Sequence, residues 1–296
     1  MMTQLAQSAR YVPRPPPATH KLVLFDVMDT LIADPFFRGF EKDLFGLEGG
    51  IKSLFAIKDQ KSFIAFEKGE INEDLHFMSY FTDRRLVDGD KVVNYMKSRY
   101  EWLPGMKQLC TELQSAGVEM AACSNCALFA ASNADSLHVL AVGCKFRALP
   151  LWVNRFPLYP RAGATTDPAP WAPHVEEATQ LSTLVPWAFV SGEMGVRKPD
   201  PEAFAAALAA VGRDAADVIF VDDSATNVEG AAAVGIESIR FEGASALRAS
   251  LALKGLPLGR LTDDIVRNAA LELSRESDDD DDGGGGRVRG GGVAKL

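Results

Sequence analysis

The stretch that decides the fold is LFDVMDTL, residues 24–31, in which an apolar run ends abruptly in an aspartate. The run Leu22–Phe25 has the length and composition of a buried strand, and Asp26 follows it directly. Ligands of parallel α/β sheets bind at the carboxyl ends of the strands. If the rest of the chain builds such a sheet, Asp26 stands where a nucleophile or a metal ligand is expected.

The chain beyond this stretch alternates strand and helix patterns. Apolar runs of strand length recur at Val118–Cys123, Trp187–Ser191, Val218–Val221 and Ile236–Phe241. Helical patterns separate most of them, at Gly105–Ala116, Pro201–Val211 and Ser224–Val234. Strands that alternate with helices of this length indicate an α/β fold, a Rossmann-like doubly wound parallel sheet.

An all-helical cap is expected to interrupt this core, dividing it into residues 21–34 and 101–260. Residues 35–100 show amphipathic helical patterns and hold nine of the seventeen phenylalanines. The helices are expected at Ser62–Lys68, Asn72–Phe81 and Lys91–Arg99. Most of these aromatic rings must form the cap's own core, which leaves some free to line a pocket.

The remaining segments are expected to be peripheral. A proline-rich insertion at about residues 148–186 predicts a surface loop, and a helix is expected at 261–276. Residues 277–296 begin with a run of aspartates and glycines, which predicts a disordered tail. Residues 1–20 are rich in proline and carry no acidic residue, as in a disordered leader or the remnant of a transit peptide.

The composition argues against several classes of partner. The formal net charge of −9 disfavours nucleic acid or an anionic membrane surface. No apolar run approaches the roughly 20 residues that a membrane-spanning helix needs. Four cysteines in 296 residues are too few for a disulfide scaffold and suit a reducing compartment. We interpret the C-x-x-C of Cys123 and Cys126 as packing at a strand end, with a redox pair as the alternative.

Polar motifs also follow the next expected strands. Ser124 and Asn125 come directly after the second strand, where a hydroxyl and an amide could bind a phosphoryl oxygen. Lys198 lies in GVRKPDPEAF, just before a helix opened by a proline, so its ammonium is expected to reach the strand ends. Arg197 is the alternative cation for that position.

A pair of carboxylates completes the pattern. Asp222 and Asp223 follow the strand in VIFVDDSATNVEGA. Adjacent carboxylates at a strand end repel each other unless a cation holds them. Mg²⁺ prefers oxygen ligands and suits phosphate chemistry, so the pair indicates a magnesium site.

Together these motifs resemble the haloacid dehalogenase (HAD) superfamily, and the resemblance covers roughly residues 21–254. It implies that Asp26 is a covalent nucleophile, that Lys198 is the catalytic positive clamp, and that Ser124 and Asn125 bind phosphate with it.

The same resemblance implies a magnesium cofactor. Its ligands would be Asp26, the backbone carbonyl of Met28, Asp222 and Asp223. The implied activity is that of a phosphoric monoester hydrolase acting on a small molecule.

A narrower likeness lies in LFDVMDTLIADPFF and, within the cap, FIAFEKGEINED. These segments resemble the plant plastid flavin mononucleotide (FMN) hydrolases. The likeness implies hydrolysis of FMN to riboflavin and phosphate in a chloroplast, whereas without it the composition suits the cytoplasm. An aromatic cap also suits a planar ring.

One departure from the superfamily pattern concerns the general acid. The usual D-x-D-G-T-L aligns Met28 with the second aspartate, which protonates the leaving oxygen. Met28 cannot do so. Asp29, one residue further, is a substitute to be tested, and its alternative role is to cap the following turn.

Other functions remain open at this point. The enzyme alternatives are a different phosphatase, for a sugar phosphate or phosphoglycolate, and a 2-haloacid dehalogenase, which also lacks the second aspartate. The non-enzymatic alternative is a HAD-fold binding or scaffold protein.

Overall fold

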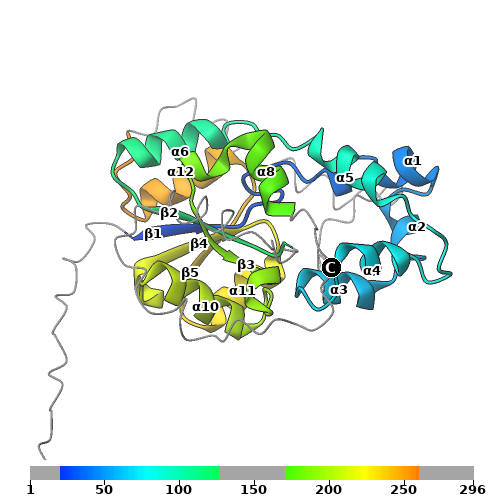
Figure 1. The fold of residues 1–296 in the computed structure, drawn as a ribbon. Coiled ribbons are helices and arrows are strands. Elements are labelled where there is room, and N and C mark those ends of the chain that lie inside the picture. The colour runs from blue at the N-terminus through cyan, green and yellow to red at the C-terminus, as the bar shows by residue number, and fades with distance from the viewer. Residues whose placement is uncertain (1–20, 127–170, 260–296) are drawn as a thin grey trace, which may run out of the picture.

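The computed structural model describes residues 21–126 and 171–259, and these contain a five-stranded parallel sheet. Its strand order is β3-β2-β1-β4-β5 (Figure 1). The strands are β1 (Leu22–Phe25), β2 (Met120–Ser124), β3 (Trp187–Val190), β4 (Val218–Asp222) and β5 (Glu237–Arg240). This confirms the predicted α/β class, with strand ends shifted by one or two residues. The expected leader, C-terminal helix and acidic tail lie outside the described residues.

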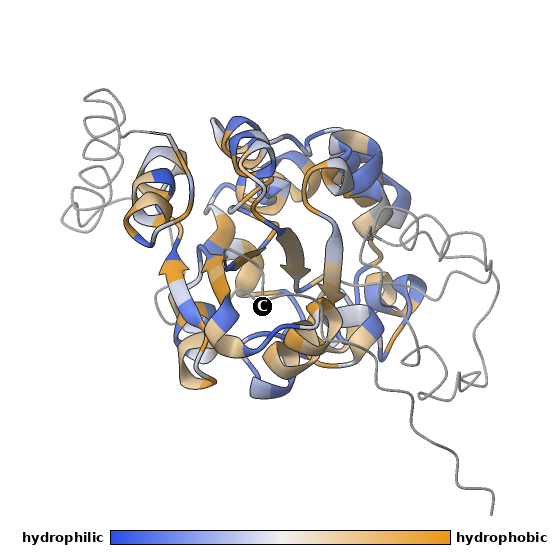
Figure 2. Cartoon of the chain, turned by 90° about the vertical axis from the view of Figure 1, so that its left-hand side faces the viewer, coloured by the Kyte–Doolittle hydropathy of each residue, from blue (hydrophilic) through white to orange (hydrophobic). Residues whose placement is uncertain are grey.

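Alternate residues of the central strand face opposite layers of helix. Val23 and Phe25 belong to the cluster on one face, and Leu22 and Leu24 to the cluster on the other. The first face is covered by α6 (Met106–Ser115), α8 (Trp171–Thr179) and α12 (Ala244–Leu253), and the second by α10 (Pro201–Val211) and α11 (Ala225–Ala233) (Figure 1). Figure 2 shows the hydrophobic strands between these layers. Because both faces are covered, β1 to β4 are largely apolar and buried, whereas β5 at one edge of the sheet (ESIR) is only partly buried.

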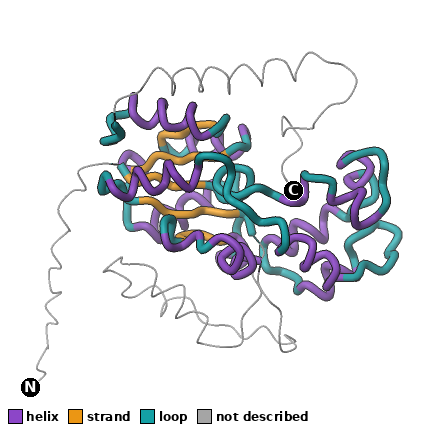
Figure 3. The backbone as a smooth tube through the Cα atoms, turned by 90° about the horizontal axis from the view of Figure 1, so that it is seen from above, coloured by secondary structure: helices purple, strands orange, loops and turns teal. Residues whose placement is uncertain are grey.

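The cap is helical, as expected, and lies beyond the carboxyl ends of the strands (Figure 3). Its elements are η1 (Pro35–Phe37), α1 (Phe40–Phe45), α2 (Ile51–Phe55), α3 (Gln60–Glu67), α4 (Glu73–Met78) and α5 (Gly89–Lys97). The Asn72 side chain accepts a hydrogen bond from the backbone N–H of Leu75, so it caps α4 as a helix-start residue should. That helix is shorter than predicted, because the chain turns after Met78.

The end of the proline-rich insertion corrects an expectation. Residues 171–183 were expected to lie in a surface loop, but they form α8 and the short helix η2 (Leu181–Thr183). Val175 and Leu181 are fully buried, and the indole N–H of Trp102 donates to the carbonyl of Thr179 at 3.1 Å. The apolar residues between the prolines were the missed signal. Residues 127–170 lie outside the described part. Among the described helices, none is long and apolar enough to cross a membrane.

Candidate active site

Lys198 and the end of β1 meet at the carboxyl edge of the sheet. The ammonium of Lys198 donates to Asp26 Oδ1 at 2.6 Å, to Asp222 Oδ2 at 2.7 Å and to the carbonyl of Cys123 at 2.8 Å. Asp26 directly follows β1, Asp222 ends β4 and Cys123 lies in β2, so three neighbouring strands converge on one amine. β1 lies where the strand order reverses, which is the expected ligand site of such a sheet.

The charge of Lys198 is set by two opposed effects. Its side chain is 0% exposed, and burial by itself lowers the pKa of an amine. Asp222 and Asp26 outweigh that burial and raise the pKa of Lys198 well above its ordinary value. The lysine is therefore a permanent cation beside the nucleophile candidate. Arg197, the alternative, contacts the cap instead.

Asp222 is held by several donors. Besides Lys198, it accepts hydrogen bonds from the backbone N–H of Ser224 at 2.8 Å and from the amide of Asn227 at 3.0 and 3.1 Å. The first turn of α11 thus fixes this carboxylate and, through it, the ammonium. Asn227 was not identified from the sequence; the signal would have been an amide at the start of an otherwise apolar helix.

A cluster of three carboxylates fits a divalent cation. Asp26, Asp222 and Asp223 each offer an oxygen, and these atoms lie within 4.8 Å of one another. The backbone N–H of Asp223 donates to the Thr30 hydroxyl at 3.1 Å, which ties this residue to the turn after β1. An all-oxygen donor set suits Mg²⁺. Both oxygens of Asp222 already accept hydrogen bonds from the protein, so Asp26 and Asp223 are the better placed carboxylates for binding a cation.

The second motif contributes to the same site in two ways. Ser124 is 1% exposed, ends β2 and lines the pocket above the strand ends. The Asn125 amide donates to the carbonyl of Lys198 at 2.9 Å, and its oxygen accepts from the Lys198 N–H at 2.8 Å. Asn125 therefore positions the lysine backbone, and its expected phosphate contact stays a prediction.

Asp29 makes its hydrogen bonds to Asp34 and Arg38, away from the carboxylate cluster, which disfavours its suggested role as acid/base substitute. It has a left-handed backbone with φ of 55° and is not among the residues that line the pocket. Its Oδ1 accepts from the Asp34 N–H at 2.9 Å and from Arg38 at 2.8 Å. The alternative reading, a carboxylate that caps the following turn, is what the geometry shows.

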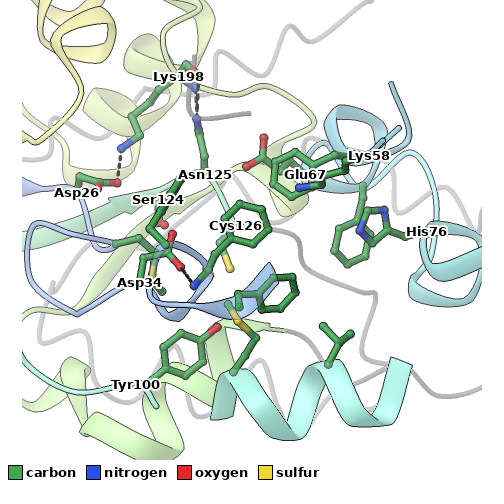
Figure 4. A pocket seen from close by; sticks show the side chains of 18 of the residues that line it. Asp26, Asp34, Lys58, Glu67, His76, Tyr100, Ser124, Asn125, Cys126 and Lys198 are labelled. Atoms are coloured by element: carbon green, nitrogen blue, oxygen red, sulfur yellow. Dashed lines mark hydrogen bonds and ion pairs between the residues drawn. The ribbon is translucent and has the colours of Figure 1, made fainter. Parts of the chain in front are cut away.

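A pocket of about 1060 Å³, counted with the part open to solvent, lies between the strand ends and the cap. Figure 4 shows Asp26 and Lys198 at one side and Lys58 and His76 at the other. The cap wall is largely aromatic, and it includes Phe36, Phe40, Phe63, Phe66, Phe77 and Tyr80. His76 stacks on Phe66 with ring centroids 4.2 Å apart. Burial lowers the pKa of His76 to about 3, so this imidazole is neutral.

A buried ion pair joins the cap to the core. Arg197 Nε lies 2.9 Å from Glu67 Oε2, and both side chains are 9% exposed. Ser191 adds a second link by donating to the Glu67 carbonyl at 2.7 Å. Burial raises the pKa of Glu67 to about 7, although Arg197 acts against that rise. The sequence offered no signal for this pair, because its members are 130 residues apart.

The C-x-x-C cysteines behave as packing residues. Cys123 belongs to the hydrophobic cluster on one face of the sheet and Cys126 to the cluster on the other. Both thiols are free and buried, and burial raises the pKa of Cys123 to about 12. A thiol that stays protonated and points away from its neighbour does not form a redox pair.

Two sequence comparisons link this chain to known hydrolases. Residues 158–235 match the family model of haloacid dehalogenase-like hydrolases. Flavin mononucleotide hydrolase 1 of Arabidopsis thaliana, a chloroplastic protein, is 30% identical over 235 residues, which cover 79% of this chain and 78% of that protein.

Solved structures of low identity also align. A HAD family enzyme of Bacteroides thetaiotaomicron, in complex with magnesium and inorganic phosphate, has a TM-score of 0.46 at 20% identity, over 75% of this chain and 93% of that one. A HAD-like family hydrolase of Porphyromonas gingivalis has a TM-score of 0.49 at 18% identity, over 80% and 99%. The L-2-haloacid dehalogenase of Xanthobacter autotrophicus has a TM-score of 0.47 at 16% identity, over 85% and 88%.

Proposed function

The chain belongs to the haloacid dehalogenase-like hydrolases, and on that basis we propose that it is a magnesium-dependent phosphatase that hydrolyses FMN to riboflavin and phosphate. The observation that carries the proposal is the position of Asp26, which ends β1 against the Lys198 ammonium and within a cluster of three carboxylates. A carboxylate held by a permanent cation at a pocket floor suits attack on an anionic phosphate ester.

The proposed reaction uses Asp26 as a nucleophile. Its carboxylate forms a bond to phosphorus, the bond from phosphorus to the alcohol oxygen breaks, and the alcohol leaves with a proton from water. Water then hydrolyses the aspartyl phosphate, which releases phosphate and restores Asp26. Lys198 would stabilise the charge that develops on the phosphoryl oxygens, and Ser124, which lines the pocket, would donate to one of them.

The metal would be held by Asp26, Asp223 and the backbone carbonyl of Met28, with Asp222 orienting Lys198 beside it. Bound magnesium would supply positive charge that screens the phosphate from the carboxylates. This cluster favours phosphatase over dehalogenase chemistry, because a phosphate dianion needs that cation and a neutral carbon–halogen bond does not.

FMN is supported as the substrate by two independent observations. The Arabidopsis relative named for this activity is 30% identical over most of both chains. The pocket above the nucleophile has a wall of aromatic side chains, which can stack on a flat ring system. The chloroplastic name of that relative supports a plastid location for this protein.

Phosphate release from a substrate panel tests the proposal. The full chain is assayed with Mg²⁺ or with EDTA on FMN, a sugar phosphate, phosphoglycolate and phenyl phosphate, and chloride release is measured from 2-chloropropionate. We expect FMN to give the highest kcat/KM and both EDTA and Asp26→Asn to abolish turnover. Chloride release without phosphate release would replace the proposal with a dehalogenase. No release from any substrate, identical for Asp26→Asn, would replace it with a binding protein.

A further inference from the structure

Lys58 is a second buried lysine, and the proposed reaction does not use it. It follows α2 in the cap, lines the pocket and is 3% exposed. Its Nζ has no hydrogen-bond partner among the described residues. An amine buried without a hydrogen-bond acceptor is unfavourable, because the aromatic rings around it replace only part of its lost hydration. A ligand that brings an acceptor to this amine would therefore gain a hydrogen bond that the protein itself does not make.

The surroundings of Lys58 define what that ligand must be. The amine lies 3.4 Å from the centroid of the Phe63 ring, 4.4 Å from that of Phe36 and 5.5 Å from that of Tyr80. Aromatic walls accept a flat ring, and the amine between them requires an acceptor at the edge of that ring. A purely hydrocarbon ring would leave the amine without a hydrogen-bond acceptor.

Two opposed effects set the pKa of Lys58. Burial is the larger one and lowers this pKa to about 7, while the carboxylates of Glu67 and Asp34 act to raise it. His76 also faces it and is neutral at that pH. Protonated or neutral, the amine carries at least two N–H donors. Lys58 can therefore donate to a neutral carbonyl or ring nitrogen without needing an anionic partner.

The position of Lys58 separates it from the chemistry. Figure 4 shows it on the cap side of the pocket, with Glu67 lying between it and the Asp26–Lys198 pair. A phosphate on Asp26 would therefore direct the rest of its ester toward Lys58. We propose that Lys58 is a specificity-determining residue that donates a hydrogen bond to the acceptor-bearing edge of a flat heteroaromatic ring. For FMN this is the edge with the ring carbonyls, so the inference rests on the proposed function.

The test compares a ring with acceptors and a ring without them. Wild type, Lys58→Met and the control Lys61→Met are assayed on FMN and phenyl phosphate, and riboflavin binding is followed by quenching of its fluorescence. Methionine keeps the aliphatic volume and removes the donors, while Lys61 is an exposed lysine of the same cap. Melting curves of all three proteins report on folding.

We expect Lys58→Met to lower kcat/KM for FMN by about 10- to 100-fold, because a missing donor leaves a ring acceptor unpaired. Riboflavin should bind about tenfold or more weakly, phenyl phosphate should change less than about twofold, and Lys61→Met should match wild type. Equal losses on both substrates, or none on either, would overturn the assignment while the FMN activity of wild type stands.

Two wild-type measurements keep the outcomes distinct. If wild type hydrolyses phenyl phosphate but not FMN, the proposed substrate fails and the ring assignment fails with it. If Lys58→Met does not fold, wild type is compared on FMN and 1-naphthyl phosphate, which is flat but has no ring acceptor. We expect FMN to be preferred by about tenfold or more, and equal kcat/KM values would overturn the role of Lys58.

Discussion

Two buried lysines line the same pocket, and their surroundings give them opposite character. Lys198 has three acceptors, two of them carboxylates, and its pKa lies above the ordinary value. Lys58 faces aromatic rings, and burial lowers its pKa to about 7. Burial alone therefore does not decide the charge of an amine; the acceptors within hydrogen-bond reach decide it.

The difference in pKa also suits the two lysines to different tasks in the pocket. A permanent cation belongs where charge develops on a transferring phosphoryl group. A donor that can lose its charge near neutral pH suits the recognition of a neutral ring. Lys198, at the strand ends, would thus contact the phosphate end of the substrate, and Lys58, in the cap, would contact its ring.

The largest expected effect comes from removing the paired amine. Lys198→Met deletes the cation beside Asp26 and leaves the buried carboxylates of Asp26 and Asp222 facing each other. We expect kcat to fall by about 10³-fold or more on FMN and phenyl phosphate alike, on the scale of losing a key electrostatic contact. Steady-state phosphate release checks this. A loss below about tenfold would remove the distinction between the two lysines.

Lys58 should make the stability of the fold depend on pH. The pKa of Lys58 falls from 10.5 unfolded to about 7 folded, so between those values only the unfolded chain binds the proton and stability rises with pH. Below pH 7 the fold bears the full cost of a buried ammonium. Lys58→Met removes that cost, and we expect it to melt about 3–8 °C above wild type at pH 6, with the gap closing toward pH 10.

Differential scanning calorimetry from pH 6 to 10 makes this measurement. Glu67, whose pKa burial raises to about 7, faces Lys58 and titrates in the same range. The comparison is therefore repeated in a Glu67→Gln background, which isolates the lysine. Lys61→Met should show no pH-dependent gap. A constant gap for Lys58→Met would mean that the amine is not buried in the way described.

The smallest expected effect concerns an ion pair outside the pocket. Asp29 pairs with Arg38 while their side chains are 21% and 43% exposed, and such pairs contribute less than about 1 kcal/mol. Asp29→Asn keeps a residue that tolerates the left-handed backbone. We expect kcat/KM for FMN to change less than about threefold. A loss above a hundredfold would return Asp29 to the list of proton donors.

The sequence was sufficient for the core because its signals are local. The apolar run before Asp26 and the proline before α10 each specify an element within a few residues, and strand ends must meet at one edge. The expected convergence of Asp26, Lys198 and Asp222 needed only the rule that the carboxyl ends of parallel strands meet at one edge of the sheet.

The contacts of the cap could not be predicted from local sequence signals. The burial of Lys58 depends on rings from η1, α3 and the turn after α4, which only tertiary packing brings together. The pairing of Glu67 with Arg197 likewise joins segments with no shared pattern. Asp29 shows the opposite case: its position next to Met28 suggested chemistry, but its hydrogen bonds to Asp34 and Arg38 disfavour that role.

The central place of β1 has a consequence for how the protein is made. Leu22–Phe25 leaves the ribosome first among the strands of the described residues, yet its partner Val218–Asp222 follows about 200 residues later. At typical synthesis rates this is a delay of about 10–40 s, during which an apolar strand has an unpaired edge. The nascent chain is therefore a natural client for chaperones that bind exposed hydrophobic segments, and a ribosome stalled before residue 218 would carry a nucleophile without its site.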